Sequence, residues 1–125
     1  MTQPLVHEPP RVVGVDELEP VLLEAFRTLR DALAAGRPVI VVVRDGDLLG
    51  QGEVADAALA NALLGLVRAL ATEGTSDGWQ VNALAVSDEL GDDARRTWIG
   101  RLTDPQGATG ALVRLGDLHL GRVPV

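Results

Sequence analysis

The sequence contains no cysteine and no lysine among its 125 residues. Without cysteine, the chain has no disulfide bonds, thiol nucleophiles or thiolate metal sites. Without lysine, every basic side chain except histidine is an arginine, and the formal net charge is −7. An acidic chain that has no basic cluster lacks the electrostatic surface that attracts nucleic acids and anionic membranes. We therefore expect neither among its binding partners.

The N-terminal region also lacks the apolar core of a signal peptide, because three prolines interrupt residues 1–10, which are typical of an extended arm. The longest apolar run is interrupted by Asn61 and Arg68, so we do not expect a membrane span. A cytoplasmic protein is the resulting expectation. Hydrophobic residues make up 46% of the sequence, which is enough for one packed core, so residues 1–125 are predicted to form a single domain.

The longest predicted element is a helix at residues 55–73. Its only strongly polar positions are Asp56, Asn61, Arg68 and the terminal pair Thr72 and Glu73. A helix that is apolar around nearly its whole circumference has no free face for water, so we expect a sheet to cover one side and something else to cover the other. The sequence GTSDG at residues 74–78 then ends the helix, and the apolar run at 79–86 has the length of a strand.

Other patterns complete an α/β arrangement. The β-branched run PVIVVV at residues 38–43 is typical of a strand covered on both faces, as in a parallel sheet. Before it, residues 16–36 carry an apolar helical stripe, with Asp16 as a capping residue at the start and Gly36 at the end. The later elements are predicted to be a helix at residues 87–98 capped by Ser87, a turn-rich link at 102–110 and a last strand at 111–115.

The predicted fold class is α/β: a truncated Rossmann-like, three-layer domain with a small, mainly parallel sheet of about three core strands. A sheet of this size leaves a hydrophobic edge, which another strand or a partner has to cover. The short run RVVGV at residues 11–15 can form a strand, and we expect it to lie at this edge.

Three patches follow one another in an order that is typical of a known family. The first is the helix at residues 16–36 with the strand after it, and the second is ALLGLVRALATEG followed by WQVNALAV, which contains Val81, Asn82 and Ala83. The third is the pair Thr109-Gly110 before the last strand. Together they resemble the short-chain dehydrogenase/reductases, in which a strand with the pattern V-N-x-(I/V/A) follows the active-site helix and a T-G pair introduces the last strand. The resemblance covers roughly the C-terminal half of such an enzyme and most of this chain.

The resemblance also implies where catalytic residues would lie. In the family, a Lys lowers the pKa of a Tyr four residues before it and holds the ribose, while the Tyr, with a nearby Ser, passes a proton to the substrate carbonyl. The matching positions here are Asp56 for the Tyr, Ala60 for the Lys and a position near Asp45 for the Ser. The chain contains neither Tyr nor Lys, so no alignment restores the pair. A glycine-rich cofactor loop after a first strand is also missing, so we expect no catalytic residues and no nicotinamide cofactor.

The chain keeps, by the same resemblance, the two helices that pack across a twofold axis in the family as a four-helix bundle. We therefore predict a non-catalytic protein that acts through oligomerisation. Its partner would be a second copy of the chain, or a full-length ketoreductase-type reductase that it stabilises. The predicted interface residues are Leu23, Phe26, Leu59, Leu63, Leu66, Val67 and Leu70.

An alternative prediction is a small enzyme or ligand-binding domain that uses the glycine-rich loop at residues 44–52, since parallel sheets bind ligands beyond the carboxyl ends of their strands. Asp45 and Asp47 on this loop are candidates for a cation site or an acid–base pair, although Asp-Gly-Asp is more typical of a turn. The remaining candidates fit structural roles better: His7 and His119 as isolated surface histidines, Trp79 and Trp98 as core or interface anchors, Ser87 without a nucleophile context, and Arg95 and Arg96 on a solvated helix face.

Overall fold

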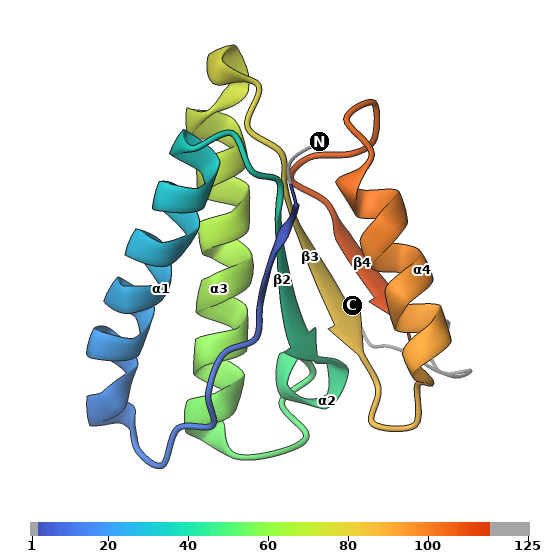
Figure 1. Ribbon diagram of the computed structural model, residues 1–125. Coiled ribbons are helices and arrows are strands. Elements are labelled where there is room, and N and C mark those ends of the chain that lie inside the picture. Colours follow the sequence, from blue (N-terminus) through green and yellow to red (C-terminus); the bar gives the residue numbers. More distant parts are fainter. Residues whose placement is uncertain (1–2, 116–125) are drawn as a thin grey trace.

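The computed structural model describes residues 3–115, which form a parallel sheet of four strands in the order β1-β2-β3-β4 with helices on both faces (Figure 1). The strands are β1 (Leu5–His7), β2 (Val39–Arg44), β3 (Val81–Val86) and β4 (Leu112–Leu115). The α-helices are α1 (Leu18–Ala34), α2 (Asp45–Leu48), α3 (Val54–Glu73) and α4 (Asp92–Thr103), with short 3-10 turns at Val15–Glu17 and Thr75–Asp77. The fold class is therefore the predicted one: a small Rossmann-like α/β domain of three layers.

The two central strands are buried on both faces, as their unbroken apolar sequences predict. Along β2, Val39, Val41 and Val43 point into the core below α1 and α3, while Ile40 and Val42 point into a second core below α4. β3 alternates in the same way, with Ala83 and Ala85 on the α3 side. Side chains that point alternately to opposite faces are a property of any strand, so a strand that is apolar at every position requires a helix layer on each side.

The helices are distributed unequally over the two faces of the sheet. The connections from β1 to β2 and from β2 to β3 pass through α1 and α3 on one face, whereas the connection from β3 to β4 passes through α4 on the other (Figure 1). Because the chain always advances across the sheet in the same direction, connections on opposite faces have opposite hands. Parallel crossovers are right-handed in nearly all proteins, so the connection through α4 is the uncommon left-handed one.

The predicted central helix is confirmed as α3. Its length and composition would also suit a membrane span, but in this fold eight of its twenty residues are buried, and the buried apolar ones pack into the core below α1 and α3. The side of α3 that faces away from the sheet carries mostly small and polar residues, and the exposed positions of the helix are Val54, Ala58, Asn61, Gly65, Arg68, Ala69, Thr72 and Glu73. The outer side is therefore less apolar than the sequence suggests, and apart from Val54 in the first turn its exposed apolar groups are small.

The edge strand is not the predicted one. Residues 11–15 are not a strand: Val13 is 94% exposed, and a 3-10 turn begins at Val15. The edge is covered instead by β1, inside the segment predicted to be an extended arm, which pairs with β2 in parallel. This gives the sheet a fourth strand. Pro4 and Pro9 flank β1 closely, and proline next to a short edge strand hinders pairing with another chain.

The predicted starts of two helices also need correction. Asp16 does not cap α1, which begins at Leu18 after the 3-10 turn and has no side-chain cap. Ser87 does not cap α4, which begins at Asp92 after Gly91 and extends to Thr103, into the predicted link. By contrast, Gly36 has a φ of 82° just after α1, where its N–H binds the carbonyl of Leu33, so the predicted glycine stop is confirmed.

Candidate functional site

Three connections meet at the carboxyl ends of β1, β2 and β3, the edge where open parallel sheets usually bind ligands. Residues 8–12, which we call the strap, leave β1 at this edge; α2 follows β2, and a turn follows β3. A cavity of about 420 Å³ lies between these segments. Its inner wall comes from the strand ends and from α3, and it includes Val43, Leu59, Ala60 and Val86.

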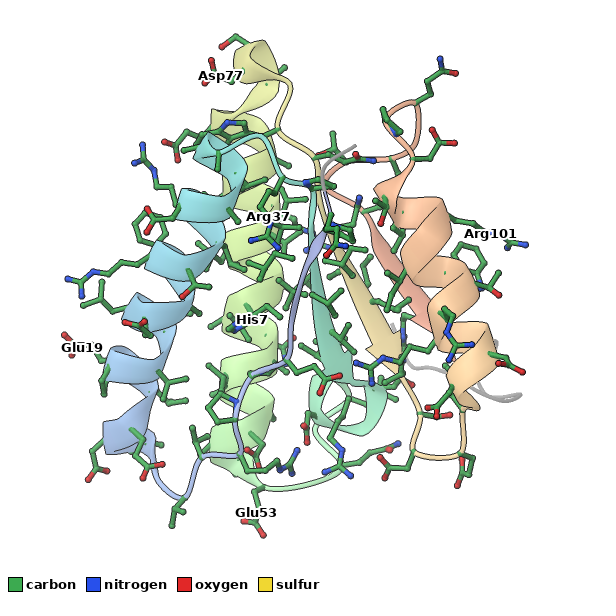
Figure 2. All side chains as sticks on the ribbon, viewed as in Figure 1. His7, Glu19, Arg37, Glu53, Asp77 and Arg101 are labelled. Atoms are coloured by element: carbon green, nitrogen blue, oxygen red, sulfur yellow. The ribbon has the colours of Figure 1, made fainter. Side chains whose placement is uncertain are left out.

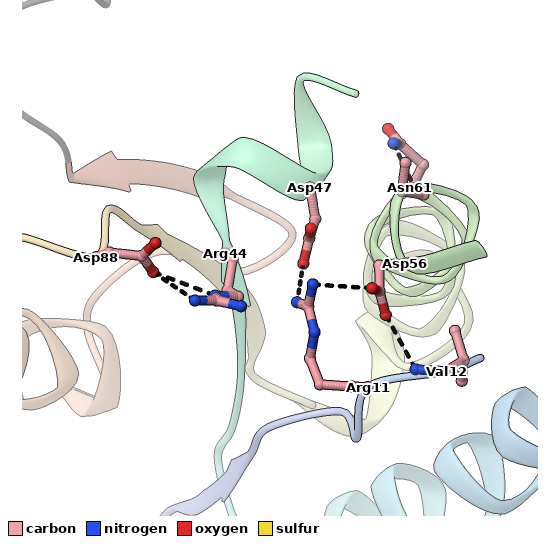
Figure 3. A network of polar contacts seen from close by, with 8 residues as sticks. Arg11, Val12, Arg44, Asp47, Asp56, Asn61 and Asp88 are labelled. Atoms are coloured by element: carbon pink, nitrogen blue, oxygen red, sulfur yellow. Dashed lines mark hydrogen bonds and ion pairs between the residues drawn. The ribbon is translucent and has the colours of Figure 1, made fainter. Parts of the chain in front are cut away.

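Arg11 of the strap bridges two buried carboxylates at the mouth of this cavity (Figure 3). Its guanidinium Nη1 lies 2.7 Å from Oδ2 of Asp47 on α2, and Nη2 lies 2.8 Å from Oδ2 of Asp56 on α3. Asp56 also accepts a hydrogen bond of 3.0 Å from the backbone N–H of Val12. Both aspartates are at most 9% exposed, whereas the Arg11 side chain is 51% exposed. One half-exposed guanidinium therefore holds two buried carboxylates and shares its single positive charge between them.

Three other pairs of charged groups link segments at this edge. Arg44 donates to Oδ1 of Asp88 at 2.9 and 3.2 Å, and this hydrogen bond, together with the charge of Asp88, raises the pKa of Arg44 above its ordinary value. Arg114 of β4 donates to Asp45 at 2.9 Å. Glu8 of the strap pairs with Arg95 of α4. These contacts join elements that are far apart in the sequence, so the charged residues here act mainly as cross-links.

The positions that match the family's catalytic residues are only partly brought together. Asp56 and Ala60 lie one helical turn apart on α3, and both line the cavity of about 420 Å³. Asp45 is paired with Arg114 and does not line that cavity. The carboxylate of Asp56 is held by Arg11, and Ala60 has no polar side chain. The geometry therefore offers no proton donor with an adjacent amine.

Two of the patches that carry the family resemblance bind each other. The side chain of Asn82, which is fully buried in β3, donates to the carbonyl of Ala108 at 2.8 Å and accepts from the N–H of Ala111 at 3.0 Å. Thr109 donates from its hydroxyl to the carbonyl of Trp79 and accepts from the N–H of Val81, both at 3.1 Å. These bonds fix the start of β4 against β3. The resemblance therefore lies in residues that hold the fold together.

The structure changes the predicted interface considerably. Leu59, Leu63, Val67 and Leu70 are at most 2% exposed, because they form the core between α3 and the sheet. They cannot contact a partner while the domain is folded, so these four predictions are corrected. The sequence misled here because an almost entirely apolar helix does not show which of its sides faces the sheet. The other three predicted residues are accessible: Leu23 is 46% exposed, and Phe26 and Leu66 are half-buried.

The two candidate carboxylates on the loop after β2 do not form a common site. This loop contains the short helix α2, and its two aspartates bind different arginines, Asp45 binding Arg114 and Asp47 binding Arg11. Among residues 3–115, no group of three or more His, Cys, Asp or Glu residues lies close enough to hold a metal ion. The α2 segment instead connects the edge of the sheet to the strap and to β4.

The remaining candidates take structural places. Trp79 packs against the main core and Trp98 against the core below α4, with the guanidinium of Arg101 stacked 4.7 Å from the Trp98 ring. His7 lies half-buried on β1, on the side of the sheet that faces α1 and α3, and this burial lowers its pKa below the ordinary value (Figure 2). Ser87 lines the cavity of about 420 Å³. His119 lies outside the described residues.

Sequence reasoning missed the two arginines that organise this edge. The sequence predicts Arg95 on a solvated helix face, but its side chain binds Glu8 and is only 33% exposed. The sequence predicts Arg11 at the start of a strand, but its side chain bridges residues 36 and 45 positions further along the chain. No local pattern marks such an arginine, because its partners are specified only by the packing of α2 and α3 around the end of β2.

Comparisons with known proteins do not place the chain in a family. No protein-family model matches the sequence, and no curated protein matches it significantly. The interpretation of the site therefore rests on its residues and their geometry.

Proposed function

We propose that this protein is a non-catalytic, cytoplasmic relative of the short-chain dehydrogenase/reductases that acts by associating with another protein through α1 and α3. The observation that carries the proposal is the combination of a cavity without the family's Tyr and Lys and an accessible apolar surface on these two helices. A domain that lacks the proton donor, the ribose anchor and the phosphate-binding loop should bind NADPH weakly at best, and isothermal titration tests this directly. Tight NADPH binding would refute the non-catalytic interpretation.

The proposed association surface comprises seven residues on the outer side of the two helices. They are Leu23 and Phe26 of α1, with Ala58, Ala62, Gly65, Leu66 and Ala69 of α3. The two groups belong to one surface, because Leu23 and Phe26 share a helix face with Arg30, and Arg30 reaches across to Glu73 of α3 at 3.1 Å. The surface is apolar at its centre, and the Arg30–Glu73 ion pair lies at one end.

Gly65 is the residue that the fold itself explains least. It lies in the middle of α3, where a glycine costs about 0.5–1 kcal/mol relative to alanine. A Cβ atom added at this position would meet nothing within 4 Å, so packing inside the domain does not require glycine. A close approach by the backbone of another helix does require a small residue. We therefore place Gly65 at the centre of the contact.

The spacing of the small residues suits a twofold contact between two copies of α3. Ala58, Ala62, Gly65 and Ala69 follow one another at intervals of four, three and four residues. If a second helix packs against this row in the antiparallel direction, Ala58 faces Ala69 of the other copy and Ala62 faces Gly65 of the other copy. A symmetric dimer uses the same patch on both subunits, and this row satisfies that condition.

The partner is either a second copy of this chain or the corresponding helix pair of an intact ketoreductase-type reductase. In the second case, binding would stabilise the folded reductase by mass action. Co-expression with reductases encoded nearby, followed by pull-down and thermal denaturation, tests this possibility. We expect a co-purifying reductase with a raised melting temperature, and we expect Gly65→Glu to abolish both effects. If no reductase co-purifies and none is stabilised, the heteromeric form of the proposal fails and self-association is left.

A matched control is available for these experiments. Gly100 is an exposed glycine within α4, on the opposite face of the sheet, and a Cβ atom added there also meets nothing within 4 Å. Gly100→Glu therefore introduces the same charge into a helix without touching the proposed surface. If Gly65→Glu and Gly100→Glu affect association equally, the surface has been assigned wrongly.

The second candidate function is ligand binding beside the segment at residues 44–52. A hollow of about 540 Å³ lies next to α2, within the usual size range of small-molecule sites, and Arg44, Asp45, Asp47 and Asp88 help to line it. This lining favours a small polar molecule. A thermal-shift screen of polar metabolites, repeated on Asp47→Asn, would support this function if one compound stabilised the wild type more than the variant. If none stabilises the wild type, the candidate is refuted.

A further inference from the structure

The strap is held by three separate elements although it has no regular secondary structure of its own. Glu8 pairs with Arg95 of α4 at one end. At the other end, Arg11 pairs with Asp47 of α2 and Asp56 of α3, and the N–H of Val12 binds Asp56 as well. Two prolines lie between these anchors at positions 9 and 10 and stiffen the segment, because their φ angles are fixed. The strap is therefore a short, stiff segment that is fastened at both ends by charges.

The strap forms one wall of the carboxyl-edge cavity, and the opposite wall is almost inaccessible to water. Leu59 and Ala60 line the cavity but are only 2% and 3% exposed. Asp56 is held by Arg11 (Figure 3). It lies one helical turn before Ala60 on α3, and both residues line the cavity. Withdrawal of Arg11 would therefore remove a group from the mouth of the cavity and expose the carboxylates of Asp47 and Asp56.

We propose that the strap is an electrostatic latch that opens and closes the carboxyl-edge cavity. In the closed state, Arg11 occupies the position between Asp47 and Asp56, and Glu8 is bound to Arg95. Opening releases the contacts of Glu8 and Arg11 together, while Val12, which is buried in the main core, stays in place with the sheet, so that the movement is a local opening of residues 8–11. The guanidinium of Arg11 is half-exposed, so its attraction to the two carboxylates is reduced by salt. The latch therefore opens more often as ionic strength rises, and its operation does not depend on the association surface.

Cysteine accessibility can measure the opening, because the chain has no native cysteine. Ala60→Cys places a thiol on the inner wall of the cavity. Ala25→Cys places one in the main core below α1, where the residue is 2% exposed, and reports on opening of the whole domain. The measured quantity is the rate at which a maleimide reagent modifies each thiol, in low and in raised NaCl.

We expect slow modification of both thiols at low salt. Arg11→Ala, combined with Ala60→Cys, should raise the rate about tenfold or more, which corresponds to a loss of about 1.4 kcal/mol of closing free energy. Raised NaCl should act in the same direction on Ala60→Cys alone, and the rate for Ala25→Cys should stay unchanged. If Arg11→Ala does not fold, the proposal is tested by the modification rate of Ala60→Cys in the Glu8→Gln variant and in the salt series. Both should raise this rate.

The control variant is Arg96→Ala, which removes an exposed ion pair with Asp93 on α4 that does not involve the strap. Equal rates for Arg11→Ala and Arg96→Ala would overturn the latch. An equal acceleration at Ala25→Cys would also overturn it, because the whole domain would then be opening. If neither Glu8→Gln nor raised NaCl changes the rate at which the Ala60→Cys thiol is modified, the latch is also overturned.

Discussion

Replacement of Asn82 by alanine should destabilise the protein more than any other change at a polar residue of the sheet. The variant loses two buried hydrogen bonds, to the carbonyl of Ala108 and from the N–H of Ala111, and leaves both backbone groups without this partner. A buried polar group without a hydrogen-bond partner costs about 1–3 kcal/mol. With the lost side-chain packing, we expect the free energy of unfolding to fall by about 2–4 kcal/mol. The start of β4 would lose its attachment to β3, so the loss should be largest there.

Urea denaturation measures this loss, and hydrogen exchange locates it. Asn61→Ala is the matched control, because Asn61 is exposed on α3 and its side chain bonds to the carbonyl of Ala57 in its own helix and, at 3.4 Å, to that of Leu48. We expect Asn61→Ala to change the free energy of unfolding by less than about 0.5 kcal/mol. We also expect the amides of β4 to exchange faster in Asn82→Ala only. If the two variants are equally stable, the hydrogen bonds of Asn82 do not hold the start of β4 against β3 as described.

Three further changes test separate parts of the structure. Gly74→Ala should cost about 1–3 kcal/mol, because the added Cβ would overlap the ring of Trp79; a melting temperature equal to that of the wild type would contradict this packing. Leu63→Glu should unfold the domain whether or not it associates, since Leu63 is fully buried; circular dichroism should show the loss, and a folded variant would refute the core assignment. His7→Gln should remove part of the pH dependence of stability. Burial lowers the pKa of His7 in the folded state, so the unfolded state binds the proton first as the pH falls below about 6.5, and the wild type loses stability there; equal losses in both proteins between pH 7.5 and 5.5 would contradict this.

Much of the fold could be predicted from the sequence because its central elements have strong periodic patterns. The buried strands β2 and β3 are almost continuous apolar runs, and α3 has the length and the apolar composition of a core helix. β1 could not be predicted in this way. This strand has only three residues, which is too few for a periodic pattern. It forms because its backbone pairs in parallel with β2.

The candidate site was less predictable, for a related reason. Asp56 and Ala60 were correctly placed on one helix, because their separation by one turn follows from the sequence. The pairing of Asp56 with Arg11 depends on where the strap crosses the ends of the strands, which no local pattern encodes. The outer face of α3 could not be predicted for the same reason. The sequence shows a glycine at position 65, but only the packed structure shows that a Cβ atom added there would meet nothing within 4 Å.

The most direct test of the proposed association is sedimentation equilibrium of the purified wild type beside Gly65→Glu and Gly100→Glu. The monomer has a mass of 13.1 kDa. When the partner is a second copy of the chain, the account predicts twice this mass for the wild type and for Gly100→Glu, and the monomer mass for a fully folded Gly65→Glu. A wild type that stays monomeric at every concentration, or a Gly65→Glu variant that dimerises as strongly as the wild type, would contradict self-association through α3.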